Sequence, residues 1–93
     1  MGKAVALITG ASRGIGKGIA LTLASHGYDI AGVATGLTSG IQDVQREVER
    51  LGQRFLPICA DIANLDEHGR TTDEAVAAFG RIDVLVNNAG VAP

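Results

Sequence analysis

The sequence predicts an α/β fold with a parallel, doubly wound sheet, and three observations support this prediction. Short apolar runs alternate with segments of helical periodicity along the chain. The links between them are short and contain glycine. The first apolar run ends in a glycine-rich turn that leads into a helical segment. Strands that alternate with helices in this manner pair in parallel through right-handed crossovers.

The first strand and the first helix follow from the apolar pattern. Residues Ala4 to Ile8 form a short, continuously apolar run, as expected of a strand that is buried on both faces. Three residues of the following helix are predicted to face the sheet: Ile15, Ile19 and Leu23. Gly18 is predicted to lie on the same side, where its missing side chain allows close approach of helix and strand.

The second strand and the second helix show the same alternation. Residues Ile30 to Ala34 are predicted as a strand, and a polar loop over residues 35–39 follows it. The next helix carries apolar residues at helical spacing on one face: Ile41, Val44, Val48 and Leu51. A glycine is expected to end each of the three predicted helices: Gly27, Gly52 and Gly80.

The third strand and the third helix are less regular. Residues 55–60 are predicted as a strand, although Pro57 removes one hydrogen-bond donor from the ladder. The third helix is predicted over residues 73–79. Two of its residues are expected to face inward: Val76 and Phe79. The start of this helix stays open, because Gly69 is unfavourable in a helix interior.

Ile82 to Val86 is the predicted fourth strand, and it completes the first half of a doubly wound sheet. The expected strand order is 3-2-1-4, within one domain that covers residues 1–93. A ligand is expected beyond the carboxyl ends of the strands, where the order reverses between the first and fourth strands. Four groups of residues follow the strand ends: 10–16, 34–35, 61–62 and 87–90.

Composition excludes several classes of function. The net charge of −2 leaves no dominant basic patch, so we expect neither nucleic acid nor an acidic membrane surface as a partner. A single cysteine, Cys59, excludes an internal disulfide and fits a reducing compartment. No stretch approaches the roughly 20 apolar residues of a membrane span. Together with the lack of a secretion signal, these features lead us to expect a cytoplasmic protein. His68 has no metal-binding partners at useful spacing, so no metal site is expected.

The glycine-rich turn runs from Thr9 to Gly16 with the spacing Gly-x-x-x-Gly-x-Gly. Such a turn directs backbone N–H groups outward, and the positive end of the helix dipole adds to them, so a phosphate can bind there. Gly10 permits the tight turn, while Gly14 and Gly16 remove side chains where a pyrophosphate and neighbouring backbone approach. The alternative is an ordinary glycine-rich connection in a parallel sheet.

Two motifs at matching strand ends identify a family resemblance. The Thr9–Gly16 turn, Asp61 after the third strand, and Asn87-Asn88-Ala89-Gly90 after the fourth resemble the short-chain dehydrogenase/reductase family. The resemblance covers nearly the whole chain, and within the family it is greatest to 3-oxoacyl-acyl-carrier-protein reductases. It implies a Rossmann-type fold and an NAD(P)-dependent oxidoreductase that acts on a small carbonyl or alcohol substrate, as a homo-oligomer in its complete form.

Cofactor preference depends on the end of the second strand, where an NAD site usually places a carboxylate. Counting from the glycines would nominate Asp29, but this residue begins the strand and therefore lies at the wrong edge. Ala34 and Thr35 occupy the correct edge, and neither is acidic. Arg13 and Thr35 match the positions that contact a 2′-phosphate in similar NADP-dependent members, so NADP is preferred over NAD. The alternative is that Arg13 is a solvated surface charge.

The resemblance implies further cofactor contacts along the same edge. Asp61 would hold the adenine amino group with the Ile62 backbone beside it, Asn87 would face the cofactor and brace the sheet, and Ala89-Gly90 would line the adenosine ribose. Asp61 could instead cap a helix or be a loop acid, and the asparagine pair could serve turn geometry. The complete set of expected cofactor-binding residues is Gly10, Ala11, Ser12, Arg13, Gly14, Ile15, Gly16, Thr35, Asp61, Ile62, Asn87, Ala89 and Gly90.

The catalytic residues of the family have no counterpart in this sequence. The family uses a serine together with a tyrosine and a lysine spaced Tyr-x-x-x-Lys. The single tyrosine, Tyr28, is followed four residues later by Gly32, and the lysines are Lys3 and Lys17. Residues 1–93 are therefore expected to be the N-terminal, cofactor-binding part of a reductase and to be inactive alone. The alternative is a non-catalytic nucleotide-binding or interaction module.

Overall fold

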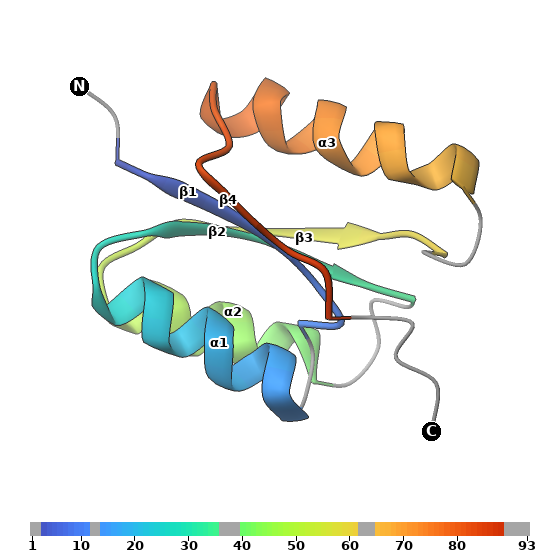
Figure 1. The fold of residues 1–93 in the computed structure, drawn as a ribbon. Coiled ribbons are helices and arrows are strands. Elements are labelled where there is room, and N and C mark those ends of the chain that lie inside the picture. Colours follow the sequence, from blue (N-terminus) through green and yellow to red (C-terminus); the bar gives the residue numbers. More distant parts are fainter. Residues whose placement is uncertain (1–2, 12–13, 36–39, 62–64, 89–93) are drawn as a thin grey trace.

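The computed structural model describes residues 3–11, 14–35, 40–61 and 65–88. Four parallel strands form one sheet in the order β3-β2-β1-β4, which confirms the predicted fold class and strand order. Helices α1 and α2 cover one face of the sheet and α3 covers the other (Figure 1). The elements are β1 (Val5–Thr9), α1 (Gly14–Ser25), β2 (Asp29–Ala34), α2 (Ile41–Arg50), β3 (Phe55–Cys59), α3 (Leu65–Phe79) and β4 (Val84–Val86).

Strand register brings the carboxyl ends of all four strands to one edge. Thr9 pairs with Val33, Ile8 pairs with Val86, and Ala34 pairs with Cys59. Two hydrogen bonds extend this alignment beyond the strands, from Ala11 N to Val33 O at 3.2 Å and from Ala60 N to Ala34 O at 3.0 Å. The links that follow the strands therefore emerge side by side.

The core lies in two layers because β1 and β2 are buried on both faces. On the α1 and α2 side, the largest fully buried side chains are those of Ile8, Ile30, Ile41, Val44 and Val48. On the α3 side, the buried residues are Leu7, Ala31, Val33, Ile58, Ala60 and Ala75. Leu51, predicted to belong to the apolar stripe of α2, lies just beyond the helix and is 46% exposed.

The buried face of α1 differs from the predicted one. Its buried residues are Gly16, Ala20 and Ala24, whereas Ile15 is 74% exposed and Ile19 and Leu23 are only half-buried. A Cβ built on Gly16 would lie 1.9 Å from the Gly10 carbonyl oxygen, so the helix is too close to the preceding turn for any side chain at position 16. Gly18 faces open space, so the prediction of close approach at Gly18 was wrong.

Helix α3 begins at Leu65, eight residues before the predicted start, and includes Gly69. Glycine in a helix interior costs about 1 kcal/mol relative to alanine. Burial of Thr71 and Ala75 against the sheet offsets this cost. Val76 is 43% exposed, so its predicted inward position was wrong, while Phe79 packs against the core as predicted. At the other end of this helix, β4 is shorter than predicted and begins at Val84.

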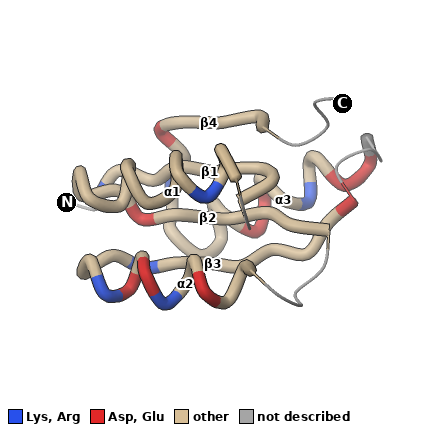
Figure 2. Tube along the Cα trace, turned by 90° about the horizontal axis from the view of Figure 1, so that it is seen from below, with Lys and Arg blue, Asp and Glu red and all other residues tan. Residues whose placement is uncertain are grey.

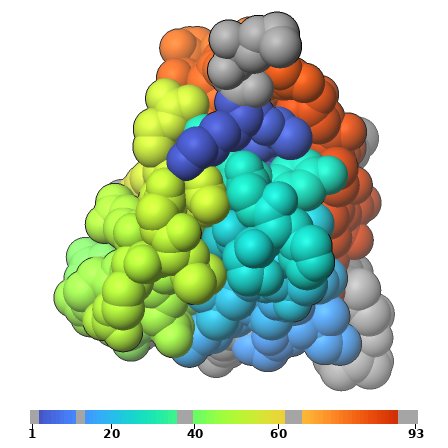
Figure 3. Space-filling model, turned by 90° about the vertical axis from the view of Figure 1, so that its left-hand side faces the viewer, coloured from blue at the N-terminus to red at the C-terminus, as the bar shows by residue number. Residues whose placement is uncertain are grey.

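Charged side chains are distributed without a basic stripe over the described residues, in line with the composition. Arginines lie among Asp and Glu on both α2 and α3, two on α2 and one on α3 (Figure 2). Several form ion pairs within one helix, such as Arg46 with Asp43 and Arg70 with Glu74. Figure 3 shows the amino-terminal edge of the sheet, where the segment before β1 contacts the end of α2, with Lys3 Nζ 2.9 Å from Gly52 O.

Asp83 links β4 to β1 at this amino-terminal edge and makes stability pH-dependent. Its carboxylate accepts hydrogen bonds from Arg81 Nε at 2.9 Å and from the Val5 N–H at 2.8 Å. Arg81, followed by the Val5 N–H, lowers the pKa of Asp83 below its ordinary value of 3.8. A lowered folded-state pKa means that the contribution to stability is complete above the ordinary pKa and is lost as pH falls through the folded-state pKa.

We therefore expect Asp83→Asn to be less stable than the parent protein at neutral pH, and the difference to shrink on acidification below about pH 3.8. Denaturant unfolding of both proteins across this range measures the difference. A difference in unfolding free energy that stays constant from neutral to acid pH would contradict the contribution assigned to the Asp83 carboxylate.

Candidate functional site

The expected site residues that the structure describes all lie at or beyond the carboxyl edge of the sheet. They come from the β1–α1 turn, the ends of β2 and β3, and the segment after β4. The described members are Gly10, Ala11, Gly14, Ile15, Gly16, Thr35, Asp61 and Asn87. The other expected members lie outside the described residues: Ser12, Arg13, Ile62, Ala89 and Gly90.

The glycine turn holds the start of α1 against the end of β1. Gly10 and Gly14 have φ angles of 65° and 61°, a region that is costly for residues with a side chain. A Cβ on Gly14 would meet nothing within 4 Å, so this position borders open space. The first turn of α1 carries no acidic residue that would oppose an anion. The N–H groups of a first helical turn have no acceptor within the helix, and together with the helix dipole they make this end of α1 suitable for a phosphate.

Thr9 joins the glycine turn to the segment after β4. Its Oγ1 accepts a hydrogen bond from Asn88 N at 2.9 Å and lies 3.3 Å from Asn87 Oδ1. Asn88 Nδ2 also donates to Gly10 O at 3.4 Å. The asparagine pair therefore braces two distant segments in addition to any role in its own turn. Asn88 and Thr9 were not predicted as site residues, although both stand inside the quoted motifs.

Asp29 lies at the opposite edge and is fully buried in an ion pair. Its Oδ1 accepts from Arg54 N at 2.8 Å, and its Oδ2 accepts from Arg54 Nε and Nη2 at 3.0 and 2.8 Å. This position confirms that Asp29 begins β2 and is separated from the site by the length of the strand. At the carboxyl edge of the sheet, where β2 ends, Ala34 is buried and Thr35 is exposed.

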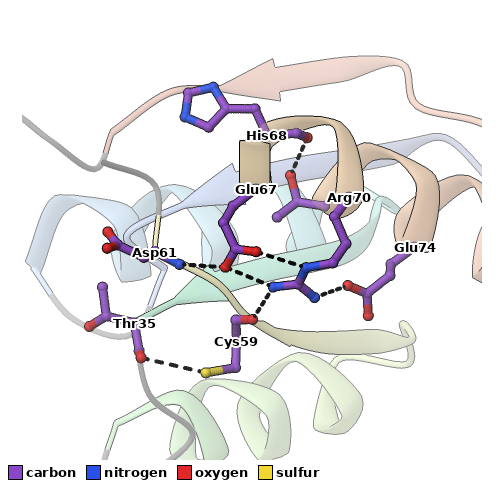
Figure 4. A network of polar contacts seen from close by, with 8 residues as sticks. Thr35, Cys59, Asp61, Glu67, His68, Arg70 and Glu74 are labelled. Atoms are coloured by element: carbon purple, nitrogen blue, oxygen red, sulfur yellow. Dashed lines mark hydrogen bonds and ion pairs between the residues drawn. The ribbon is translucent and has the colours of Figure 1, made fainter. Parts of the chain in front are cut away.

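Thr35 and Asp61 lie near each other because β2 and β3 are neighbours. The Cys59 thiol donates to Thr35 O at 3.5 Å, which places the end of β3 beside the residue after β2 (Figure 4). Asp61 is exposed, and its backbone N–H donates to Glu67 Oε1 at 3.2 Å. Since α3 begins at Leu65, Asp61 is not its N-cap residue.

Glu67 and Arg70 of α3 complete this corner of the site, and neither was predicted from the sequence. Arg70 donates to both carboxylate oxygens of Glu67 at 3.1 Å and to Cys59 O at 2.7 Å (Figure 4). Arg70, followed by the Asp61 N–H, lowers the pKa of Glu67, so the carboxylate stays ionised at neutral pH. The i, i+3 spacing of a glutamate and an arginine was visible in the sequence, but their contacts to β3 were not.

The side of the site next to β4 is open. Leu85 is 64% exposed on the α3 face of the sheet. It borders a depression between α3 and β4 that is lined by Leu7, Thr9, His68, Thr71, Thr72, Leu85 and Asn87.

Within the described ranges, no cluster of His, Cys, Asp or Glu is arranged to hold a metal ion. The helices described also lack the combination of length and hydrophobicity that crossing a membrane requires.

Comparisons with known proteins agree on one family. Residues 4–93 match the family described as short chain dehydrogenase. The chain is 49% identical over 86 residues to 2-dehydro-3-deoxy-D-gluconate 5-dehydrogenase of Pseudoalteromonas atlantica, covering 92% of this chain and 34% of that protein. It is 45% identical over 86 residues to the 3-oxoacyl-acyl-carrier-protein reductase of Staphylococcus epidermidis, covering 92% and 35% respectively.

A solved structure shows the same arrangement of elements. The 3-oxoacyl-acyl-carrier-protein reductase of Brucella melitensis in complex with NAD superimposes with a TM-score of 0.88 at 40% identity. The match covers 97% of this chain and 34% of that one. The present chain thus spans about a third of the length of the curated relatives cited here.

Proposed function

Because this chain belongs to the short-chain dehydrogenase family, we propose that it forms the cofactor-binding part of an NADP-dependent oxidoreductase. The observation that carries the cofactor preference is the position of Asp29. This carboxylate is fully buried against Arg54 at the amino-terminal edge, and no acidic residue takes its place at Ala34 or Thr35. A ribose 2′-hydroxyl would lack its usual carboxylate partner there, whereas a 2′-phosphate would meet no repulsion from these positions.

Each segment at the carboxyl edge has a proposed role toward NADP. The backbone of the Gly10–Gly16 turn binds the pyrophosphate, and Arg13 and Thr35 bind the 2′-phosphate. Asp61 and the Ile62 backbone bind the adenine. Ala89 and Gly90 line the adenosine ribose, while Asn87 faces the cofactor and braces the sheet. When bound, NADP supplies a nicotinamide that gives or accepts a hydride.

We propose that catalysis belongs to sequence beyond residue 93. The chain covers about a third of its relatives, and Leu85 of β4 and Ile15 of α1 are exposed apolar side chains that a longer protein would cover. The serine, tyrosine and lysine of the family would lie in that part. The complete protein is proposed to be a cytoplasmic homo-oligomer that reduces a small carbonyl compound or oxidises an alcohol, with a 3-oxoacyl thioester as one candidate.

Binding of NADPH and NADH to the complete protein tests the cofactor preference. The parent protein is expected to bind NADPH more tightly than NADH. Arg13→Ala should weaken NADPH binding by about 10- to 100-fold, the effect of losing a hydrogen bond to a charged group, and leave NADH binding nearly unchanged.

Arg46→Ala is the matched control, because Arg46 is an exposed arginine on α2 that pairs with Asp43. This variant is expected to bind both cofactors like the parent protein. Tighter binding of NADH by the parent protein, or an equal loss for both cofactors in Arg13→Ala, would contradict the proposal.

A further inference from the structure

Two side chains of α3 fix the backbone at the end of β3. Arg70 Nη2 donates to Cys59 O at 2.7 Å, and the Asp61 N–H donates to Glu67 Oε1 at 3.2 Å (Figure 4). The two contacts lie on either side of Ala60, which is itself buried and bonded to Ala34 O. The three-residue segment that leads to Asp61 is therefore held by β2 on one side and by α3 on the other.

The same two side chains are also held to each other. Arg70 Nε lies 3.1 Å from Glu67 Oε2, and Arg70 Nη2 lies 3.1 Å from Glu67 Oε1. A planar guanidinium that binds both oxygens of a carboxylate fixes the orientation of both groups. Glu74 pairs with Arg70 through the other terminal nitrogen, Nη1, and not through the Nη2 that donates to Cys59 O (Figure 4). Glu67 and Arg70 thus act as one rigid unit against the backbone.

This unit has a geometric consequence for the Asp61 side chain. The β3 strand is at the edge of the described sheet and pairs only with β2, so its end has no second strand to hold it. Bonds from α3 restrict the backbone on the amino side of the Asp61 Cα, and that backbone sets the direction in which the carboxylate leaves the chain. Since Asp61 is exposed, this direction determines which atoms of a bound ligand its carboxylate can contact.

We propose that Glu67 and Arg70 are positioning residues that orient Asp61 toward the adenine amino group and thereby set the purine selectivity of the cofactor site. This inference rests on the proposed function, in which Asp61 binds adenine. A carboxylate accepts a hydrogen bond from the 6-amino group of adenine. It is repelled by the 6-oxo group of hypoxanthine, so its placement separates the two bases.

The test compares NADPH with its hypoxanthine analogue, nicotinamide hypoxanthine dinucleotide phosphate, as ligands of the complete protein. The parent protein is expected to bind NADPH more tightly. Glu67→Ala is expected to lower the ratio of the two affinities by about tenfold, the effect of one misplaced hydrogen bond. Glu67→Gln keeps an oxygen acceptor for the Asp61 N–H and should retain more of the ratio than Glu67→Ala.

Glu74→Ala is the matched control, since it removes an ion pair with Arg70 and leaves both contacts to β3 in place. Its affinity ratio should equal that of the parent protein. If Glu67 had a purely structural role, Glu67→Ala would weaken the binding of both ligands equally and leave the ratio of the two affinities unchanged. If the parent protein binds NADPH more tightly than the analogue, an unchanged ratio in Glu67→Ala would overturn this inference. The proposed function would still stand.

A parent protein that binds neither ligand would overturn the proposed function itself, and the inference with it. A parent protein that binds both ligands equally would contradict the adenine role of Asp61. Glu67→Gln changes little in shape, so it yields a ratio even if Glu67→Ala does not fold. A Glu67→Gln ratio as low as that of Glu67→Ala would contradict the role of the acceptor oxygen.

Discussion

Replacing Gly16 with alanine is expected to weaken NADPH binding by at least about 100-fold, because two or more backbone bonds to the pyrophosphate would be misplaced. The new Cβ would lie 1.9 Å from Gly10 O and 2.7 Å from Gly10 C, and both are backbone atoms that no rotamer change can move. The start of α1 would have to move away from the glycine turn. Overpacking of this kind also costs about 1–3 kcal/mol of unfolding free energy.

Gly18→Ala provides the matched control within the same helix. A Cβ on Gly18 would meet nothing within 4 Å, so the substitution adds no clash. It is expected to stabilise the protein by up to about 1 kcal/mol through helix propensity and to leave NADPH binding unchanged. Fluorescence titration with NADPH and denaturant unfolding measure both effects. Parent-like affinity in Gly16→Ala would show that the close approach is not needed for the site.

Replacing Asp29 with alanine is expected to lower the unfolding free energy by about 3 kcal/mol, the cost of breaking a buried ion pair by removing one partner. Asp29 is fully buried and accepts hydrogen bonds from Arg54 N, Nε and Nη2. The Arg54 side chain is 61% exposed and lies 4.7 Å from the centre of the Phe79 ring. Because it keeps contact with water, the loss should fall at the lower end of the range for buried pairs.

Asp43→Ala is the control for this prediction, since Asp43 pairs with Arg46 on the surface of α2 and both side chains are more than 60% exposed. Its effect should be at most about 0.5 kcal/mol. Denaturant unfolding at neutral pH compares the two variants, and equal losses would refute the structural role given to Asp29. Titration with NADPH and NADH adds a second readout. Asp29→Ala should keep the parent protein's cofactor preference, because the residue lies far from the site.

The sequence was sufficient to predict the topology and the edge of the sheet at which the described candidate residues gather. Alternation of strands and helices with right-handed crossovers leaves few arrangements, and the order 3-2-1-4 is one of the common ones for a doubly wound sheet. Parallel strands end at a common edge, so residues after different strands are brought together whatever the side-chain details. The same rule separated Asp29 from the site, although counting along the chain would have placed it there.

Only the tertiary structure decided how closely the elements approach and which side chains connect them. Hydrophobic periodicity reports where apolar residues recur, not the distance between a helix and its neighbours. It therefore favoured Ile15 over Gly16 as the buried position at the start of α1. The bond from Asn88 to Thr9 joins residues 79 positions apart, and that from Asp61 to Glu67 joins a strand end to a helix. Such contacts depend on packing in three dimensions, and local sequence patterns carry no signal for them.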